Sequence, residues 1–280
     1  MQSIIRSHAK INLALNVIGK TPTLHKIESI VAFVSLYDEI IIKKINSDKH
    51  NISFTGKFSK NISKKNTISK LLEVLENKKL LKNDKFKIII KKNIPIKSGL
   101  GGGSMNAANI LSYLISKKIV KTTQKEIIKI SKLVGSDVLL GLDSTNSILN
   151  SKNKIERFTD CRKIYTLIVK PNLGCSTKKI YSKIRKFDKP KLNKPSKDMF
   201  NLNNLKKMTN SLEPIALSMH SSLKRIKIFL ESSTHAEFVR MTGSGSALVA
   251  YFYSKGKCDI AKKQFNKKYK NYWCISSKTI

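Results

Sequence analysis

The sequence predicts an α+β fold of two domains, and three observations lead to that prediction. The chain has 280 residues, and domains usually hold about 100–200. Hydrophobic residues make up 40% of it, enough for a sizeable core. The predicted strands and helices lack the regular strand–helix–strand rhythm of a doubly wound parallel sheet. A boundary in the region 150–163 then separates an N-terminal domain, residues 1–155, from a C-terminal domain, residues 156–280.

In the N-terminal domain, hydrophobic periodicity and turn residues predict the elements. Apolar and more polar residues alternate over residues 10–18, as in a half-buried strand, and a Gly- and Pro-containing loop follows at 19–25. Asn66 or Thr67 is the expected N-cap of the first helix. Strands are predicted at 10–18, 26–34, 36–44, 52–54, 86–91 and 146–150, and helices at 67–81, 104–117 and 122–134.

The C-terminal domain shows the same two periodicities. Pro190 and Pro195 interrupt a polar stretch, so residues 188–204 are expected to form a loop. Strands are predicted at 164–170, 237–242, 247–253 and 271–276, and helices at 176–187, 212–232 and 258–269. No internal repeat is visible.

The formal net charge of +37 raises the hypothesis of a nucleic-acid-binding protein. Of the 55 basic residues, however, only six are Arg and 49 are Lys, and Arg is the residue that binds phosphate and guanine in a bidentate manner. The lysines are also spread evenly along the chain. We therefore interpret the charge mainly as a solvated surface that attracts anionic ligands.

The lengths of the apolar runs, the N-terminal residues, and the spacing of the cysteines and histidines predict the compartment and the metal content. No apolar run approaches the ~20 residues of a membrane span, and the N-terminus does not resemble a secretory signal. The four cysteines show no CxxC spacing and are expected to be free thiols in the cytoplasm. The five histidines are equally scattered, so no zinc site is expected.

Residues 95–104 form the strongest local signal, with Gly99, Gly101, Gly102 and Gly103 within five positions. Such a run costs conformational entropy, which makes sense where the backbone must approach another group closely. It directly precedes a predicted helix, whose N-terminal N–H groups and dipole favour an anion. It matches neither the P-loop nor the dinucleotide fingerprint. We therefore predict a phosphate-binding loop of another kind, with a flexible linker as the alternative.

Two further features accompany this loop. Ser104 offers a hydroxyl group to a phosphate or to Mg²⁺. A second glycine turn, Gly243-Ser244-Gly245, joins two predicted strands and by itself is typical of a hairpin.

In their order and spacing, five segments of the chain resemble the GHMP kinases, the family of galactokinase, homoserine kinase and mevalonate kinase. The resemblance extends from about residue 5 to the end of the chain. It implies the two-domain GHMP kinase fold: a ribosomal protein S5 domain 2-like N-terminal domain, a C-terminal α/β domain, and ATP and substrate in the cleft between them. The segments are Ala9-Lys10-Ile11-Asn12-Leu13; His25 in a loop before a strand; Gly99-Leu100-Gly101-Gly102-Gly103-Ser104 with Asn106-Ala107-Ala108; Gly135-Ser136-Asp137-Val138; and Met241-Thr242-Gly243-Ser244-Gly245-Ser246.

The chain is most similar to the family members that phosphorylate the 2-hydroxyl of a cytidine-diphosphate-linked sugar alcohol in non-mevalonate isoprenoid synthesis. The resemblance implies a small-molecule kinase that uses ATP and Mg²⁺. Asp137 would take the proton from the substrate hydroxyl, with Lys10 beside it and the transferred phosphoryl group. The ATP phosphates would be wrapped by Pro95, Ile96, Lys97, Ser98, Gly99, Leu100, Gly101, Gly102, Gly103, Ser104 and Met105. The substrate would be contacted by Asn12, His25, Thr177, Tyr181, Gly243, Ser244 and Gly245, with Asn12 and His25 at the cytidine and Tyr181 stacking on cytosine.

These roles agree with the chemistry, although each has a structural alternative. Phosphoryl transfer depends on positioning and on charge neutralisation, which a lysine supplies, and an aspartate of ordinary pKa can accept the hydroxyl proton late. Alternatively, Lys10 is one more surface lysine, Asp137 caps a helix, and Tyr181 packs in the core.

The chain departs from the family pattern at several positions. In Thr23-Leu24-His25, Leu24 stands where the family has an aromatic residue that would stack on cytosine. Leu139 replaces a proline after the Asp137 motif, and Met105 replaces the second serine of a pair. The family's Gly-x-Gly hairpin is replaced by residues 150–154. Because of Leu24, a GHMP kinase for another alcohol, of the homoserine or mevalonate type, is an alternative function.

A second alternative belongs to another class, a basic RNA-binding protein without catalytic activity. It leaves the glycine loop unexplained. A kinase of this family would act on a small molecule, without membrane or nucleic-acid partners, as a monomer or a homodimer.

Overall fold

The computed structural model describes residues 2–22 and 24–280, and it divides the chain into two compact units. Unit 1 comprises Met1–Ala9, Leu36–Ile96 and Gly101–Ser144, and unit 2 comprises Lys10–Ser35, Lys97–Leu100 and Thr145–Ile280. The division is not a single cut because two long strands, β1 (Gln2–Lys20) and β2 (His25–Ile45), run through both units. The boundary between residues 155 and 156 stays a prediction.

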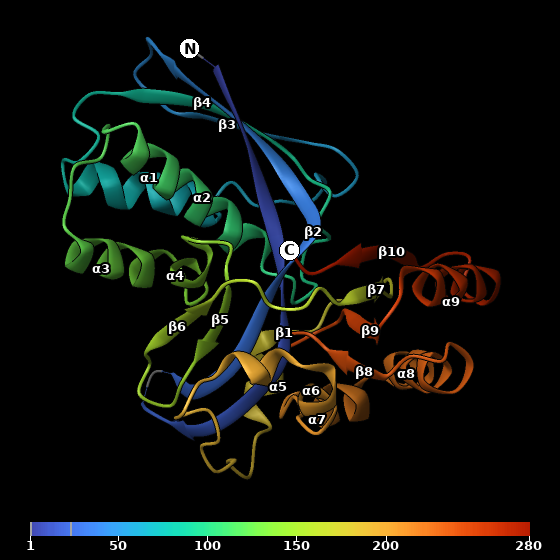
Figure 1. Ribbon diagram of the computed structural model, residues 1–280. Coiled ribbons are helices and arrows are strands. Elements are labelled where there is room, and N and C mark those ends of the chain that lie inside the picture. Colours follow the sequence, from blue (N-terminus) through green and yellow to red (C-terminus); the bar gives the residue numbers. More distant parts are fainter. Residues whose placement is uncertain (1, 23) are drawn as a thin grey trace. The chain divides into compact units, whose positions relative to one another are not determined.

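Unit 1 is a small sheet covered by helices. Strand β4 (Lys85–Lys91) pairs in parallel with β3 (Asn51–Thr55) and antiparallel with the second half of β2. Helices α1, α2 and α3 lie beside one another and form a common core with this sheet (Figure 1). The helices of this unit are α1 (Thr67–Asn77), α2 (Gly102–Ser116), α3 (Gln124–Val134) and the short α4 (Val138–Gly141).

The local sequence explains why these elements form. Phe86, Ile88 and Ile90 alternate with more exposed residues along β4 and are buried, as a period of two requires. Asn66 is the N-cap of α1, because its side chain accepts hydrogen bonds from the backbone N–H groups of Ile68 and Ser69. The prediction of a helix beginning at residue 67 is confirmed.

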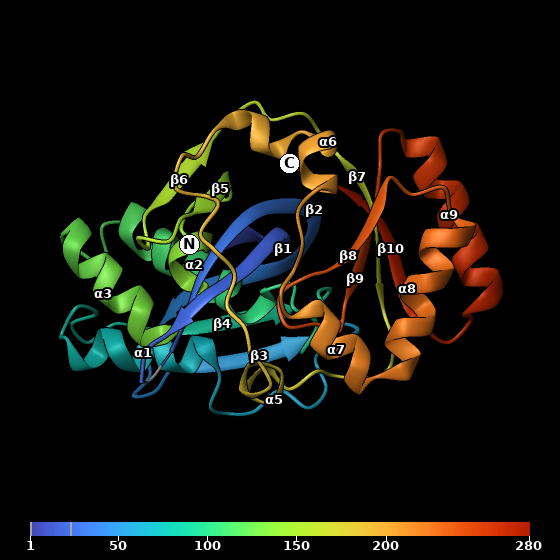
Figure 2. The same ribbon diagram turned by 90° about the horizontal axis from the view of Figure 1, so that it is seen from below.

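Unit 2 contains an antiparallel sheet in the order β10-β7-β9-β8. Its helices α8 (Ser221–Ser233) and α9 (Lys255–Lys268) lie together against one face of this sheet (Figure 2). The first half of β2 pairs with β5 (Asn146–Leu149), which pairs in turn with β6 (Ile155–Phe158). The sheet strands are β7 (Tyr165–Lys170), β8 (Phe238–Met241), β9 (Leu248–Phe252) and β10 (Trp273–Lys278).

Several predicted boundaries differ from the structure. The helix predicted at 67–81 ends at Asn77, and the strand predicted at 10–18 extends over Gln2–Lys20. Two further differences change how the chain is divided into elements. The strands expected at residues 26–34 and 36–44 are the single strand β2, which continues through Ser35 because its hydroxyl is hydrogen-bonded to that of Ser277 at 2.9 Å. The helix expected at residues 212–232 is divided into α7 (Glu213–Met219) and α8. The break is at His220, whose backbone is extended (φ −135°, ψ 91°).

The region between β7 and α7 also differs from the prediction. The helix expected at residues 176–187 is only α5 (Thr177–Ser182). The predicted loop 188–204 contains a 3₁₀ turn (Lys197–Phe200) and the start of α6 (Leu202–Lys206). Asn201 caps α6, and Leu202 and Leu205 on it are buried. Short helices of this kind depend on tertiary burial and lack a clear periodic signal. Strand β6 and helix α4 are too short for the periodicity to predict them.

The predicted α+β class is confirmed, since strands and helices occur in both units and most strand pairs are antiparallel. Within residues 2–22 and 24–280, no helix has both the length and the apolar character that crossing a membrane requires. All four cysteines are free thiols. Thr23, part of the predicted loop 19–25, lies outside the described residues.

Candidate active site

Lys10 is a buried cation held by its neighbour along strand β1. Its side chain is 4% exposed, and its ammonium donates to Oδ1 of Asn12 at 2.6 Å. The Asn12 amide nitrogen donates in turn to Oγ of Ser29, at 2.8 Å. A lysine that is merely part of a solvated surface would have its ammonium in water. Lys10 is therefore positioned by a buried polar network in unit 2.

Thr242 connects this network to both glycine segments. Its hydroxyl oxygen accepts from the backbone N–H of Asn12 at 2.9 Å. The hydroxyl proton is directed at the carbonyl oxygen of Gly99, 3.3 Å away, and at Oδ1 of Asn12, 3.4 Å away. Thr242 thus joins strand β1, the first glycine of the loop and the glycine turn.

The two glycine segments meet so closely that side chains are excluded. Gly99 and Gly243 both have positive φ, +80° and +54°. A β-carbon on Gly243 would lie 3.2 Å from the carbonyl oxygen of Gly99. The backbone N–H of Ala247 also donates to the carbonyl oxygen of Ser98, at 3.0 Å. Glycine is required at these positions for close backbone approach within unit 2.

Four more of the predicted substrate residues form two pairs in unit 2. The hydroxyl groups of Thr177 and Ser244 are hydrogen-bonded at 2.8 Å, so the start of α5 is tied to the glycine turn. His25 and Tyr181 are in ring contact, with centroids 4.8 Å apart and planes at 41°. Burial, followed by the nearby charge of Lys20, lowers the pKa of His25 below its ordinary value of 6.5. Both effects favour the neutral form of the His25 imidazole.

In unit 1, the glycine loop passes directly into helix α2. Gly101 is its N-cap, in the left-handed conformation with φ 70°, and the first N–H groups of a helix have no partner within the helix. Ser104, in the first turn, is partly exposed. This helix end therefore presents backbone N–H groups and a hydroxyl group, which is what an anion-binding helix N-terminus needs.

Asp137 lies close to this helix end. The turn that carries it contacts the first turn of α2, because a β-carbon on Gly135 would stand 3.7 Å from Oγ of Ser104. Asp137 is the N-cap residue of α4 and is partly exposed. Its Oδ1 is 3.5 Å from the hydroxyl of Ser136, at the limit of a hydrogen bond. In unit 1, a carboxylate and a serine hydroxyl thus lie beside the same helix N-terminus.

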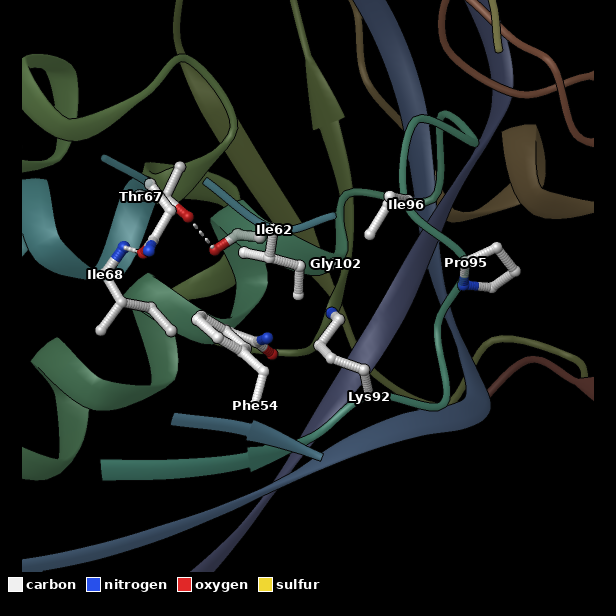
Figure 3. Close-up of a pocket in the computed structure, with 11 residues that line it drawn as sticks. Phe54, Ile62, Thr67, Ile68, Lys92, Pro95, Ile96 and Gly102 are labelled. Carbon is white, nitrogen blue, oxygen red and sulfur yellow. Dashed lines mark hydrogen bonds between the residues drawn. The ribbon is translucent and has the colours of Figure 1, made fainter. Parts of the chain in front are cut away.

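A pocket of about 100 Å³ opens beside the same helix end (Figure 3). Most of its lining is apolar, and its polar side chains come from Asn66, Thr67, Lys92 and Asn106. The lining residues are Phe54, Ile62, Asn66, Thr67, Ile68, Lys92, Pro95, Ile96, Gly102, Gly103 and Asn106.

The predicted loop residues differ in how far their side chains are buried. Leu100 and Met105 are fully buried, and Met105 packs so closely on Gly141 that a β-carbon there would be 2.7 Å from its sulfur atom. Only backbone groups of these two residues can face a ligand. Lys97, by contrast, is exposed, with a positive φ of 50°.

Sequence reasoning missed several residues of the site. Thr242 belongs to one of the motifs, yet the motif does not mark it as a site residue. Phe54 and Lys92 line the pocket, and Lys92 is paired with the buried carboxylate of Asp38; no motif contains these three residues. For Asp38 a signal existed, since it is an acidic residue inside a run of strand-forming residues. Lys92 is one of 49 lysines, and nothing in the sequence distinguishes it from the others.

Comparisons with known proteins show which family the chain belongs to. Residues 66–149 match the model of the GHMP kinases N terminal domain. A 4-diphosphocytidyl-2-C-methyl-D-erythritol kinase of Pelagibacter ubique is 52% identical over 276 residues, which cover 99% of this chain and 98% of the relative. The chain belongs to the GHMP kinase family. The enzyme of the same name from Clostridioides difficile is 29% identical, with 98% of this chain and 94% of the relative covered.

Solved structures show that the fold is that of the GHMP kinases. A crystal structure of 4-(cytidine 5'-diphospho)-2C-methyl-D-erythritol kinase matches 99% of this chain and 100% of its own length, with a TM-score of 0.80 and 20% identity. A homoserine kinase from Cytophaga hutchinsonii matches 100% of this chain and 94% of its own length, with a TM-score of 0.70 and 14% identity. The predicted two-domain GHMP kinase fold is confirmed, and this GHMP kinase is a small-molecule kinase that uses ATP.

Proposed function

We propose that this GHMP kinase transfers the γ-phosphoryl group of ATP to the 2-hydroxyl of 4-(cytidine 5'-diphospho)-2-C-methyl-D-erythritol, in the synthesis of isoprenoid precursors without mevalonate. The observation that carries the proposal is the 52% identity, over nearly the whole chain, to a relative of that name. The network of Lys10, Asn12 and Thr242 supports it, because it holds a buried cation beside a glycine segment in unit 2.

In this proposal Asp137 accepts the proton of the substrate hydroxyl as the bond to phosphorus forms. The proton transfer is late, so a carboxylate serves as the base. Lys10 is oriented by Asn12 and neutralises charge on the transferred group, and its burial strengthens that effect. Asp137 positions the substrate hydroxyl, and Lys10 stabilises the charge of the transition state. Catalysis of phosphoryl transfer consists mainly of such positioning and charge stabilisation.

The nucleotide would be bound by residues 95–105. We assign its phosphates to the N-terminus of α2, where backbone N–H groups and Ser104 face an anion, and its base to the pocket of Figure 3. Mg²⁺ prefers oxygen ligands, and we assign it to the Ser104 hydroxyl and the Asp137 carboxylate, which offer oxygen atoms near that helix end. Mg²⁺ would supply charge neutralisation at the phosphates.

The cytidine would be recognised by Asn12, His25 and Tyr181. A neutral imidazole can both donate and accept a hydrogen bond at a base edge, and Tyr181 provides a ring face for stacking. The Thr177–Ser244 pair and the backbone of Gly243 and Gly245 would line the alcohol part of the substrate.

A second candidate is a GHMP kinase that acts on another alcohol. The observation in its favour is Leu24, which is 69% exposed at the position of the family's stacking aromatic residue. An aliphatic side chain there offers a weaker platform for cytosine.

ADP release by the purified protein, with ATP, Mg²⁺ and a panel of alcohols, tests the proposal. We expect turnover with the diphosphocytidyl substrate, competition by free cytidine nucleotides, and a loss of about 10²–10⁴-fold in the Asp137→Asn variant. Ser136→Ala is the matched control in the same turn and is expected to remain active.

Turnover with homoserine or mevalonate in place of the diphosphocytidyl substrate would favour the second candidate. Full activity of Asp137→Asn would exclude the assigned base. RNA binding with a steep salt dependence, and no phosphoryl transfer to any alcohol, would favour a non-catalytic basic protein.

A further inference from the structure

Asn210 is a buried amide in the segment between helices α6 and α7, and it belongs to none of the five sequence motifs. Its side chain is 3% exposed. Its Nδ2 donates to two main-chain carbonyl oxygens, that of Met241 at 2.8 Å and that of Gly243 at 2.9 Å. Its Oδ1 accepts from the backbone N–H of Leu212 at 3.0 Å. Both amide protons and the amide oxygen of Asn210 are therefore in use within unit 2.

Main-chain hydrogen bonds hold the segment around Asn210 on strand β1. The backbone N–H of Leu15 donates to the carbonyl oxygen of Thr209 at 3.0 Å, and the backbone N–H of Ser211 donates to the carbonyl oxygen of Leu15 at 2.9 Å. They make a parallel bridge between Leu15 and Asn210. None of these bonds involves the Asn210 side chain, so the segment should keep its place when that side chain is changed.

The two carbonyl groups that Asn210 binds belong to the glycine turn. Met241 is the last residue of β8, and Gly243 is the first glycine of the turn. The peptide between Gly243 and Ser244 is trans, and the C=O and N–H groups of a planar trans peptide point in opposite directions. Because the carbonyl of Gly243 is held toward Asn210, the N–H of Ser244 must point to the other side. Asn210 therefore sets the orientation of this peptide.

The backbone N–H of Ser244 is a donor that the protein itself does not use. Within residues 2–22 and 24–280 it donates to no acceptor, and Ser244 is partly exposed. The Ser244 hydroxyl is hydrogen-bonded to that of Thr177 at 2.8 Å. The residue is thus fixed through its side chain by Thr177 and through the preceding peptide by Asn210. A donor that is held in place in this way binds an oxygen atom without a further cost of ordering.

The turn is also connected to the buried network of Lys10. Thr242, between the two carbonyls that Asn210 binds, accepts from the backbone N–H of Asn12. Asn12 in turn orients the Lys10 ammonium. The orientation of the turn is therefore coupled to residues that the proposed function places at the substrate.

We propose that Asn210 is a positioning residue for the alcohol substrate: it keeps the Gly243–Ser244 peptide turned so that the N–H of Ser244 donates to an oxygen atom of that substrate. The inference rests on the proposed function, which places the substrate at this turn. It goes further because it names the donor group and a residue outside the motifs that orients it.

Asn210→Asp is the sharpest variant. It keeps the shape of the side chain and the acceptor for Leu212, but an ionised carboxylate has no proton to donate. The carbonyl of Gly243 then faces a negative charge, and the peptide is no longer held. We expect KM for the alcohol to rise about tenfold or more, because the substrate loses a positioned donor. The calorimetric dissociation constant of ATP, measured without alcohol, should stay within about threefold of the wild-type value.

The KM separates positioning from a simple loss of folded protein. A variant that merely folds less well contains fewer active molecules, so its apparent kcat falls and its KM is unchanged. Asn210→Leu is the second variant, because it lacks a donor even where an aspartate would hold a proton, and it should raise KM in the same way. Should one of the two variants fail to fold, the other decides.

Asn204→Asp is the matched control. Asn204 is in α6, and its amide also donates to a main-chain carbonyl oxygen, that of Asp198 at 2.8 Å. It has no contact with the glycine turn among the hydrogen bonds of the described residues. Its substitution should leave KM for the alcohol and the affinity for ATP unchanged.

An unchanged KM for the alcohol in the folded Asn210 variants would overturn the inference, as would an equal rise in KM and in the dissociation constant of ATP. Wild-type turnover with another alcohol, and not with the diphosphocytidyl substrate, would contradict the proposed function. A rise in KM for that other alcohol would still support the inference, and an unchanged KM would overturn it. No turnover with any alcohol would overturn both.

Discussion

The carbonyl oxygen of Thr242 lies where a β-carbon on Gly99 would stand. Gly99 begins the dense run of glycines that leads into α2, and Thr242 precedes the glycine turn between β8 and β9. The two residues are 143 positions apart, yet their backbones approach as closely as a missing side chain allows. Two motifs of the sequence are thus parts of one structure in unit 2.

Replacing Gly99 by alanine should separate these two backbones. Its φ of +80° is unfavourable for alanine, and the added methyl group has no space. We expect the free energy of unfolding to fall by about 1–3 kcal/mol, with a loss of phosphoryl transfer. Urea denaturation and ADP release measure the two effects. Gly256→Ala in α9, where no atom lies within 4 Å of the new methyl group, should be neutral or slightly stabilising; equal behaviour of the two variants would contradict this account.

Thr242→Val should weaken the network around Lys10 without changing the shape of the side chain. The variant leaves the buried N–H of Asn12 without its acceptor at 2.9 Å, which costs about 1–3 kcal/mol of stability. Since Asn12 also orients Lys10, we expect kcat to fall as well. Thr242→Ser retains the hydroxyl group and should keep most of the activity. A fully active valine variant would show that this hydroxyl does not organise the site.

Leu24→Tyr should strengthen cytidine binding if the proposed substrate is right. Leu24 is largely exposed beside His25, so a ring can be added there without disturbing the core. Stacking of a base on an aromatic ring contributes about 1–3 kcal/mol, which predicts a dissociation constant for CMP lower by roughly 5- to 100-fold. Calorimetry measures it, with GMP as the control ligand. Unchanged CMP affinity would indicate that cytosine does not bind next to residue 24.

The pKa of His25 should lie below 6.5, because burial and then the charge of Lys20 disfavour the imidazolium. The unfolded chain binds a proton at about pH 6.5, so any stability from this group is present above that pH and is lost as the pH falls. An NMR titration of the His25 ring measures the midpoint. Lys20→Gln should raise it, while Lys255→Gln should leave it unchanged. A midpoint above 6.5 in the wild type would contradict the prediction.

Much of the fold could be predicted because its signals are local. The alternation in residues 86–91, the cap at Asn66 and the apolar side of α2 are set by residues within one or two turns of each other. The positions at which helices and strands end were harder to predict. At His220 the chain leaves the helix without glycine, and at Ser35 a strand continues through a polar residue because Ser277 supplies a partner.

The candidate site was predictable where a motif carries it. Gly99, Gly243 and Asp137 belong to segments whose order along the chain identified the family. The pairing of Asp38 with Lys92 could not be predicted, since a buried ion pair between residues 54 positions apart leaves no periodic pattern. For Met105 the motif predicted a contact with the ligand, but the side chain is buried in the core.

By itself, the sequence determined the α+β class, the positions of most strands and helices, the glycine loop before α2 and membership of a kinase family. The class, the elements and the glycine loop follow from residue type and short spacing, and the family follows from the order of five motifs along the chain. Only the tertiary structure decided which side chains meet: Thr242 with Asn12, His25 with Tyr181, and Asp38 with both ends of the loop. The physical reason is that hydrogen bonds and close backbone contacts act over about 3 Å in space, whereas these partners are tens to hundreds of residues apart in the chain.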